Sequence, residues 1–217
     1  MPEMVQVGNE TNPELMGGKK DRPINWERNA TLLNAGIRAV RDAGKTASVN
    51  PRIMLHIAQP ENVEPWFEAA TMAGVNDYDV IGISYYRKWS TRSISQLGET
   101  IANLKKRYPV DVILVETAYP FTNGYADNSP NLLGKYSLIS GYPATPKGQL
   151  KYLTDLPQAV VDNGGIGVVY WEPAWVSTDC KTRWGVGSNW ENAAWFDLKR
   201  HEALPALKFL GQDYKKN

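Results

Sequence analysis

The chain of 217 residues contains one cysteine, and none of its apolar runs approaches the roughly 20 residues of a membrane-spanning helix. Because Cys180 is alone, an intrachain disulfide is excluded, and a cysteine-based metal site is disfavoured. The net charge is only +1, and the charges are dispersed. The sequence therefore indicates neither a nucleic-acid surface nor a binding site for anionic membranes.

Phenylalanine is also scarce, with 4 residues against 8 tryptophans and 11 tyrosines. Most aromatic rings in this chain therefore carry a polar group. Such rings are typical of clefts that bind sugars, although they also suit ordinary packing at the edge of a core.

Strand-like and helix-like segments alternate along the whole chain. With 42% hydrophobic residues, the chain is long enough for one sizeable core, and we expect a single domain over residues 1–217. No hairpin signal separates the strand-like runs, so the alternation predicts an α/β fold with a parallel sheet. The expected strands are 4–10, 52–58, 79–86, 111–117 and 166–171, and the expected helices are 26–43, 62–73, 93–108, 146–163 and 202–210.

Each expected strand has a polar or aromatic residue at or near its carboxyl end. In a parallel sheet the carboxyl ends of all strands lie at one edge, which is where a (β/α) barrel carries its active site. For any single residue, a hydrogen bond at a loop junction is the simpler explanation. Five such residues at matching places favour a functional site, and they are Glu10, His56, Tyr85, Glu116 and Trp171.

Four short runs resemble the endo-β-1,4-galactanases of glycoside hydrolase family 53. They are Val-Gly-Asn-Glu at 7–10, Gly-Ile-Ser-Tyr-Tyr at 82–86, Val-Glu-Thr-Ala-Tyr-Pro at 115–120 and Tyr-Trp-Glu-Pro-Ala-Trp at 170–175. The resemblance spans nearly the whole chain. It implies a (β/α)8 barrel of which this chain holds about five βα units, corresponding to strands 4 to 8, and lacks the first three.

The resemblance implies Glu10 as the acid/base, at the end of strand 4, and Glu116 as the nucleophile, at the end of strand 7. Retaining hydrolysis requires two carboxyl groups about 5 to 5.5 Å apart, one protonated and one ionised. Asn9 would hydrogen-bond the sugar 2-hydroxyl, and Tyr85 would orient the nucleophile. No cofactor is required for this chemistry.

Three further residues are candidate substrate-binding residues, and each has a structural alternative. His56 either hydrogen-bonds near Glu10 or packs at a strand end. Trp171 and Trp175 either stack on galactose rings or lie buried between the last strand and the last helix.

A structural calcium ion is implied in the long loop that follows Glu116, because some similar galactanases hold one there. Asp127 and Asn128 offer oxygen ligands, and Asp179 in the following loop is a possible second contributor. The acidic residues are more widely spaced than in a calcium loop, and a turn-forming loop is the alternative.

The predicted function is endo-hydrolysis of β-1,4-galactan with retention, by double displacement. The alternatives are a weak or inactive galactan-binding remnant and a fragment without an independent role. The resemblance also implies an extracellular or periplasmic protein, whose signal peptide would precede this segment. Because five strands leave two open edges, we expect a homo-oligomer, in the simplest case a dimer, that covers the opening.

Overall fold

The computed structural model describes residues 2–12, 14–16, 23–175, 177–183 and 185–216. Its centre is a parallel sheet whose strands follow one another in chain order. Pairing keeps one register along each of the first two neighbouring pairs, for example Val5 with Ile53 and Leu55 with Ile81. The strands are β1 (Met4–Gln6), β2 (Arg52–Ala58), β3 (Val80–Ser84) and β4 (Asp111–Glu116).

A fifth parallel segment, residues 166–169, runs along the free side of β4. Its Ile166 N–H donates to the Val112 carbonyl and its Val169 N–H to the Leu114 carbonyl, both at 2.8 Å. Leu114 and Val168 form a parallel bridge between the two segments. The predicted five-stranded parallel sheet is therefore confirmed, with β1 and the 166–169 segment as its edges.

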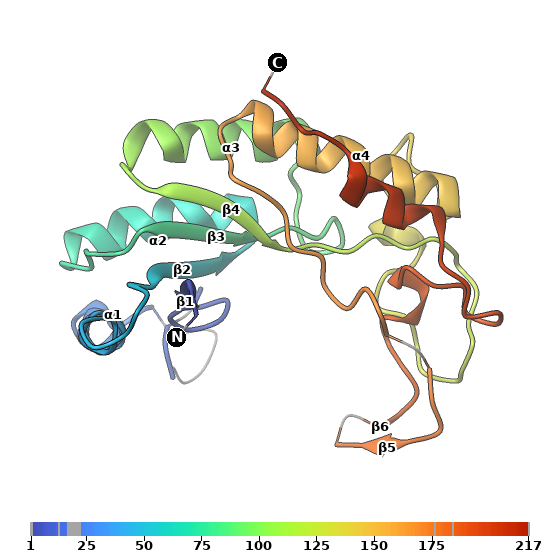
Figure 1. Cartoon of the computed structure of the whole chain (residues 1–217), viewed down its shortest axis with the longest axis horizontal. Coiled ribbons are helices and arrows are strands. Elements are labelled where there is room, and N and C mark those ends of the chain that lie inside the picture. Colours follow the sequence, from blue (N-terminus) through green and yellow to red (C-terminus); the bar gives the residue numbers. More distant parts are fainter. Residues whose placement is uncertain (1, 13, 17–22, 176, 184, 217) are drawn as a thin grey trace.

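Four helices follow one another around one side of the curved sheet (Figure 1). Side-chain capping explains three of the four helix starts. Asn25 and Thr145 accept backbone hydrogen bonds at two of them, and Ser93 forms a capping box with Gln96 at a third. The helices are α1 (Trp26–Gly44), α2 (Pro60–Met72), α3 (Ile94–Arg107) and α4 (Pro146–Asp162). None of the described helices is long and apolar enough to cross a membrane.

Two expectations about the C-terminal third were wrong. The last helix is not an α-helix over 202–210 but the 3₁₀ helix η3 (Pro205–Gly211). Its buried residues, Ala206 and Phe209, are three apart, and the 3₁₀ period places such residues on one face. A small antiparallel hairpin, β5 (Lys181–Thr182) and β6 (Gly185–Val186), was not expected, because strands of two residues show no alternating pattern. Two further 3₁₀ turns are η1 (Lys135–Ser137) and η2 (Glu191–Ala193).

The sheet face opposite the helices is closed by a small apolar cluster of its own. Met54, Val80 and Val115 are all at least nine-tenths buried there. Met54 and Val115 meet over Gly82, where an added Cβ atom would lie 2.8 Å from the Met54 sulfur. Gly82 therefore lets its neighbours cover the strand, so part of the inner face is shielded within the chain itself.

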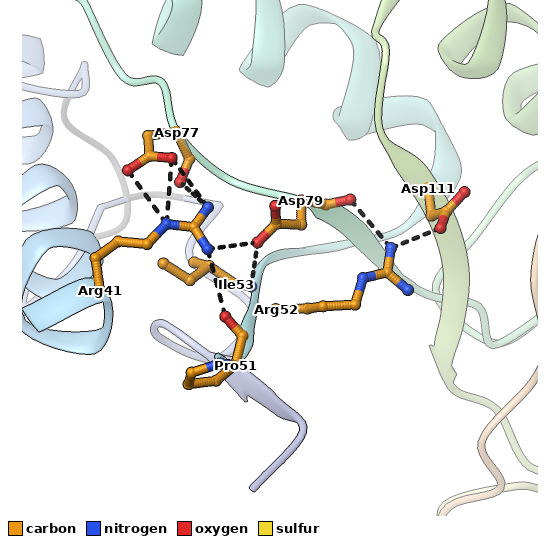
Figure 2. Close-up of polar contacts among 7 residues, drawn as sticks. All are labelled: Arg41, Pro51, Arg52, Ile53, Asp77, Asp79 and Asp111. Atoms are coloured by element: carbon orange, nitrogen blue, oxygen red, sulfur yellow. Dashed lines mark hydrogen bonds and ion pairs between the residues drawn. The ribbon is translucent and has the colours of Figure 1, made fainter. Parts of the chain in front are cut away.

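Charged side chains link the amino ends of the strands, at the edge opposite Glu10 and Glu116 (Figure 2). Arg41 on α1 contacts Asp77 at 2.9 Å and Asp79 at 3.0 Å. Asp79 in turn accepts the Ile53 N–H of β2 at 2.7 Å. Arg52 on β2 pairs with Asp111 on β4 at 2.5 Å. These contacts fasten α1 and three strands to one another where the strands begin.

We expect Arg41→Met to lower the free energy of unfolding by about 1 to 3 kcal/mol, because it removes hydrogen bonds to two carboxylates and leaves Asp79 without its cation. Lys45→Met is the matched control. Lys45 directly follows α1 and pairs with Asp42, but both side chains are largely exposed. It should leave the unfolding free energy nearly unchanged, because an exposed ion pair is screened by solvent. Urea denaturation of both variants measures the difference, and equal losses would contradict a specific role for Arg41.

Candidate active site

The segment that carries Glu10 leaves β1 through a tight turn and is fastened to the end of β2. Gly8 has a φ of 82°, and an added Cβ atom there would lie 2.5 Å from the Thr11 side chain. Glu10 itself has a left-handed φ of 44°. The Thr11 N–H donates to the His56 carbonyl at 3.0 Å, which holds the turn in place. The strained backbone at Glu10 is thus fixed by its neighbour strand.

Glu116 is turned into the site by an irregularity in β4. Ile83 of β3 pairs with Leu114, but Ser84 pairs with Glu116, so β4 has one extra residue at this point. Such a bulge re-aims the side chain that follows it. Glu116 therefore reaches the same side of the sheet as Ser84.

Glu10, His56 and Glu116 meet at the carboxyl edge of the sheet. One oxygen of each carboxyl and one ring nitrogen of His56 all lie within 4.8 Å of one another. The Glu10 N–H donates to His56 Nδ1 at 3.4 Å, and His56 Nε2 lies 2.7 Å from the Ser84 hydroxyl. Both alternatives for His56 apply. Its side chain is fully buried at the strand end, and its Nδ1 accepts a hydrogen bond from the Glu10 N–H.

The carboxyl groups of Glu10 and Glu116 form a carboxylate pair whose members influence each other electrostatically. Burial, followed by the nearby charge of Glu10, raises the pKa of Glu116 to about 7. The Tyr86 hydroxyl donates to Glu116 Oε2 at 3.0 Å and partly opposes this rise. Burial lowers the pKa of His56 to about 4, so its ring is neutral at ordinary pH. The carboxylate pair can therefore retain a proton at nearly neutral pH.

The hydroxyl group that hydrogen-bonds to Glu116 is that of Tyr86. The position of Tyr85 does not support the role expected for it, which was to orient the nucleophile. Tyr85 is fully buried in the core, and its hydroxyl donates to the Arg92 carbonyl at 2.8 Å. Successive side chains of a strand point to opposite faces, so Ser84 and Tyr86 share the site face while Tyr85 points away. This alternation was readable in the run 82–86 and would have identified Ser84 and Tyr86.

A cleft of about 510 Å³ opens above the carboxylate pair. Asn9 lines it and accepts a hydrogen bond from Gln6, so its predicted position beside Glu10 is observed. The opposite wall is aromatic. The ring centroids of Trp171 and Trp190 lie 6.4 Å apart. The side chains of Trp171 and Trp89 are 38% and 44% exposed. Trp89 and Trp190 were not predicted, because they lie in loops without a strand-end pattern. The remaining lining residues are Asn12, Ala58, Gln59 and Tyr86.

Trp175 lies apart from this cleft. It lines a separate, much smaller cavity together with Ala126, Phe196 and His201. No contact of the described residues brings it to the carboxylate pair. Trp175 is half-buried beside Phe196 and His201, and this position favours packing over stacking on a sugar at the carboxylate pair.

Asp127, one of the expected calcium ligands, is held by hydrogen bonds within the protein. Asp127 accepts hydrogen bonds from Ser129 N–H at 2.7 Å, from Ser188 N–H at 2.8 Å and from the Ser177 hydroxyl, so it joins two loops. Asn128 and Asp179 are exposed. This arrangement fits a turn-forming loop better than a cage of oxygen ligands. A calcium ion in this loop stays a prediction.

The group of Glu10, His56 and Glu116 is the one cluster in the described part of the chain with three side chains of metal-binding type. Both ring nitrogens of His56 already have hydrogen-bond partners, the Glu10 N–H and the Ser84 hydroxyl. His56 is therefore committed to protein contacts. The arrangement fits acid/base chemistry by the two carboxyl groups better than metal binding.

Comparison with known proteins gives a consistent match. The model of glycosyl hydrolase family 53 matches residues 1–210. An arabinogalactan endo-beta-1,4-galactanase of Cellvibrio japonicus is 51% identical over 220 residues, covering 99% of this chain and 58% of that protein. An endo-beta-1,4-galactanase of Bacillus subtilis is 32% identical and covers 94% of this chain and 53% of that protein.

Among solved structures, the GH53 catalytic domain of Ignisphaera aggregans superimposes with a TM-score of 0.83 at 32% identity, covering 96% of this chain and 58% of that chain. The chain therefore spans somewhat more than half the length of these relatives.

The raised pKa of Glu116 predicts a measurable stability effect. The folded protein binds a proton at Glu116 up to about pH 7, whereas an ordinary glutamate releases it near 4.5. Ionisation therefore destabilises the fold as the pH rises through this window. We expect Glu116→Gln to raise the melting temperature by about 2 to 5 °C at pH 8, with the difference fading towards pH 4.5.

Glu99→Gln, at an exposed position of α3, is the control and should leave the melting temperature unchanged at both pH values. Differential scanning calorimetry across this pH range checks the prediction. If Glu116→Gln changed the melting temperature by the same amount at every pH, ionisation of Glu116 would not be the cause.

Proposed function

From the premise that this chain belongs to glycosyl hydrolase family 53, we propose that it hydrolyses β-1,4-galactosidic linkages within galactan chains. The observation that carries the proposal is the carboxylate pair, whose oxygens approach within 4.8 Å at the floor of an open, aromatic-lined cleft. An open cleft admits a polymer along its length, as endo-hydrolysis requires.

The spacing of the two carboxyl groups supports retention of configuration. Inverting glycosidases hold their carboxyl groups about 6.5 to 9.5 Å apart to admit a water molecule, whereas retaining ones hold them about 5 to 5.5 Å apart. One oxygen of each carboxyl lies within 4.8 Å of the other, which is closer to the retaining spacing than to the inverting one. We infer that one carboxylate attacks the anomeric carbon and the other protonates the leaving oxygen, then activates water in the second step.

We assign Glu116 as the nucleophile and Glu10 as the acid/base. The hydrogen bond from Tyr86 favours the ionised form of Glu116, as a nucleophile needs. The raised pKa of Glu116 supports the reverse assignment, with the proton on Glu116. The family resemblance favours Glu116 as the nucleophile, and trapping of the intermediate separates the two assignments.

The residues around the carboxylate pair suit a sugar chain. Asn9, at the mouth of the cleft beside Glu10, would hydrogen-bond the 2-hydroxyl, a contact that strengthens at the transition state. The exposed faces of Trp171 and Trp89 would pack on galactose rings. Because polymeric galactan is too large to cross a membrane, we also propose that the protein acts outside the cytoplasm.

The first activity prediction concerns the nucleophile. Wild-type protein should release oligosaccharides from galactan but not from arabinan or xylan. Glu116→Gln should lower the rate by about 10³- to 10⁵-fold, because no covalent intermediate can form, while binding persists. Glu99→Gln should keep full activity. A 2-fluorogalactoside with a good leaving group should label Glu116 in peptide mapping. A label on Glu10 would reverse the two roles.

Galactan binding by the wild type without any hydrolysis would instead support a binding remnant. Equilibrium dialysis with galacto-oligosaccharides separates this outcome from a protein that neither binds nor cleaves. Trp171→Ala is the control, because it should weaken the binding of galacto-oligosaccharides whether or not the wild type hydrolyses galactan.

A second activity prediction concerns the acid/base. Glu10→Ala should slow hydrolysis of galactan far more than formation of the glycosyl-enzyme from an aryl galactoside with a good leaving group, because that group departs without protonation. Added azide should accelerate the second step and yield a galactosyl azide. Similar losses on both substrates without azide rescue would indicate that Glu10 has only a structural role.

We also propose that two copies associate through an edge of the sheet. The 166–169 segment forms one edge, and its Ile166 and Val169 are 45% and 50% exposed. Exposed apolar side chains on an unpaired edge favour pairing with a second chain. The shielding of the inner face by Met54 and Val115 limits the contact to the edge itself.

Light scattering behind a sizing column tests the association. The wild type should elute as a dimer at micromolar concentration, and Val169→Lys should shift it to monomer. Leu210→Lys, at an exposed apolar position on η3, is the control and should stay dimeric. A wild type that is monomeric and melts cooperatively would rule out the dimer.

A further inference from the structure

The hydrogen bonds around His56 determine which of its ring nitrogens carries the proton. Nδ1 faces the backbone N–H of Glu10, which is a donor, so Nδ1 must be the acceptor. The ring of His56 is neutral, because its burial disfavours a charge. The single ring proton therefore sits on Nε2 and points at the Ser84 oxygen, 2.7 Å away.

This assignment fixes the direction of the Ser84 hydroxyl in turn. Its oxygen accepts from His56, so its own hydrogen must point elsewhere. Glu10 Oε1 lies 2.7 Å away and is the other hydrogen-bond partner of the hydroxyl among the described residues. Ser84 is fully buried, so solvent does not compete for that hydrogen. Ser84 thus donates to Glu10 Oε1.

The two oxygens of Glu10 are consequently not equivalent. Oε1 is occupied as an acceptor by Ser84, whereas no hydrogen bond to a described residue holds Oε2. The charged and titratable groups that face Glu10 are His56 from β2, Tyr86 beyond β3 and Glu116 from β4. Tyr86 is committed to Glu116, so it does not compete with Ser84 for Glu10.

We propose that Ser84, oriented by the Nε2–H of His56, is a positioning residue that keeps Glu10 Oε1 as a permanent acceptor and leaves Oε2 as the oxygen that gives and takes the catalytic proton. The part of this inference that concerns catalysis rests on the proposed function. In the first step the Oε2 proton passes to the leaving glycosidic oxygen as its bond to the anomeric carbon breaks. In the second step Oε2 takes a proton from the attacking water.

The hydrogen-bond chain can be tested without any activity. The chain has only two histidines, so ¹⁵N-histidine spectra are simple, and His201→Asn assigns the remaining signals to His56. At pH 7 we expect His56 to be protonated at Nε2 only. In Ser84→Ala the Nε2–H proton should move upfield and exchange faster with water, while Ser90→Ala should leave it unchanged.

Ser90 is a matched control because it is also buried and its hydroxyl also donates to a glutamate, Glu61, at 2.7 Å. A wild-type His56 protonated at Nδ1, or charged at pH 7, would overturn the proposal. If Ser84→Ala fails to fold, the wild-type spectrum still decides between the tautomers.

Kinetics then test the positioning role. In Ser84→Ala, kcat/KM for galactan should fall about 10- to 100-fold, as expected for loss of one hydrogen bond to a charged group. For an aryl galactoside with a good leaving group it should fall less than about threefold, because formation of the glycosyl-enzyme then needs no proton. Ser84→Thr, which keeps the hydroxyl, should recover most of the galactan activity, and Ser90→Ala should match the wild type.

Equal losses of kcat/KM on both substrates would overturn the proposal, because a general distortion of the site would affect them alike. A wild type that cleaves no galactoside would refute the proposed function. The histidine spectra would then still decide whether Ser84 and His56 form the chain.

Discussion

Two carboxyl groups of like charge are held within 4.8 Å of each other, and much of the structure serves to keep them there. Burial of Glu116 and the nearby charge of Glu10 raise the pKa of Glu116. Each carboxyl receives a hydroxyl hydrogen bond, from Ser84 on one side and from Tyr86 on the other. Both hydroxyls come from the end of β3, which lies between the strands that lead to the two carboxyls.

The amino ends and the carboxyl ends of the strands affect stability in opposite ways. At the amino edge, opposite charges pair: Arg41 contacts two aspartates and Arg52 contacts Asp111, so this edge adds stability. At the carboxyl edge, like charges approach and the Glu10 backbone adopts a left-handed conformation, so this edge costs stability. Between them, the apolar cluster around Gly82 packs the strands together. The same strands, β2 and β4, carry the ion pair of Arg52 and Asp111 where they begin and lead to His56 and Glu116 where they end.

Much of the fold and part of the site were predictable from particular residues. Apolar runs bounded by glycine and proline identified the five parallel strands, and capping residues such as Ser93 marked the helix starts. Parallel strands bring their carboxyl ends to one edge, so the meeting of Glu10, His56 and Glu116 was predictable. Tyr86, not Tyr85, contacts Glu116, because residues 84 and 86 share one face of the strand and residue 85 points to the other.

The sequence by itself therefore determined the order of the elements, the family and the two carboxyl groups, because these follow from local patterns of polarity and short motifs. The tertiary structure alone decided how the carboxyl groups are oriented. The bulge that turns Glu116 and the chain from His56 through Ser84 to Glu10 join residues far apart in the sequence. The aromatic wall depends likewise on loops whose paths are set by packing. Such contacts leave no periodic signal, since they arise only when separate strands and loops are brought together.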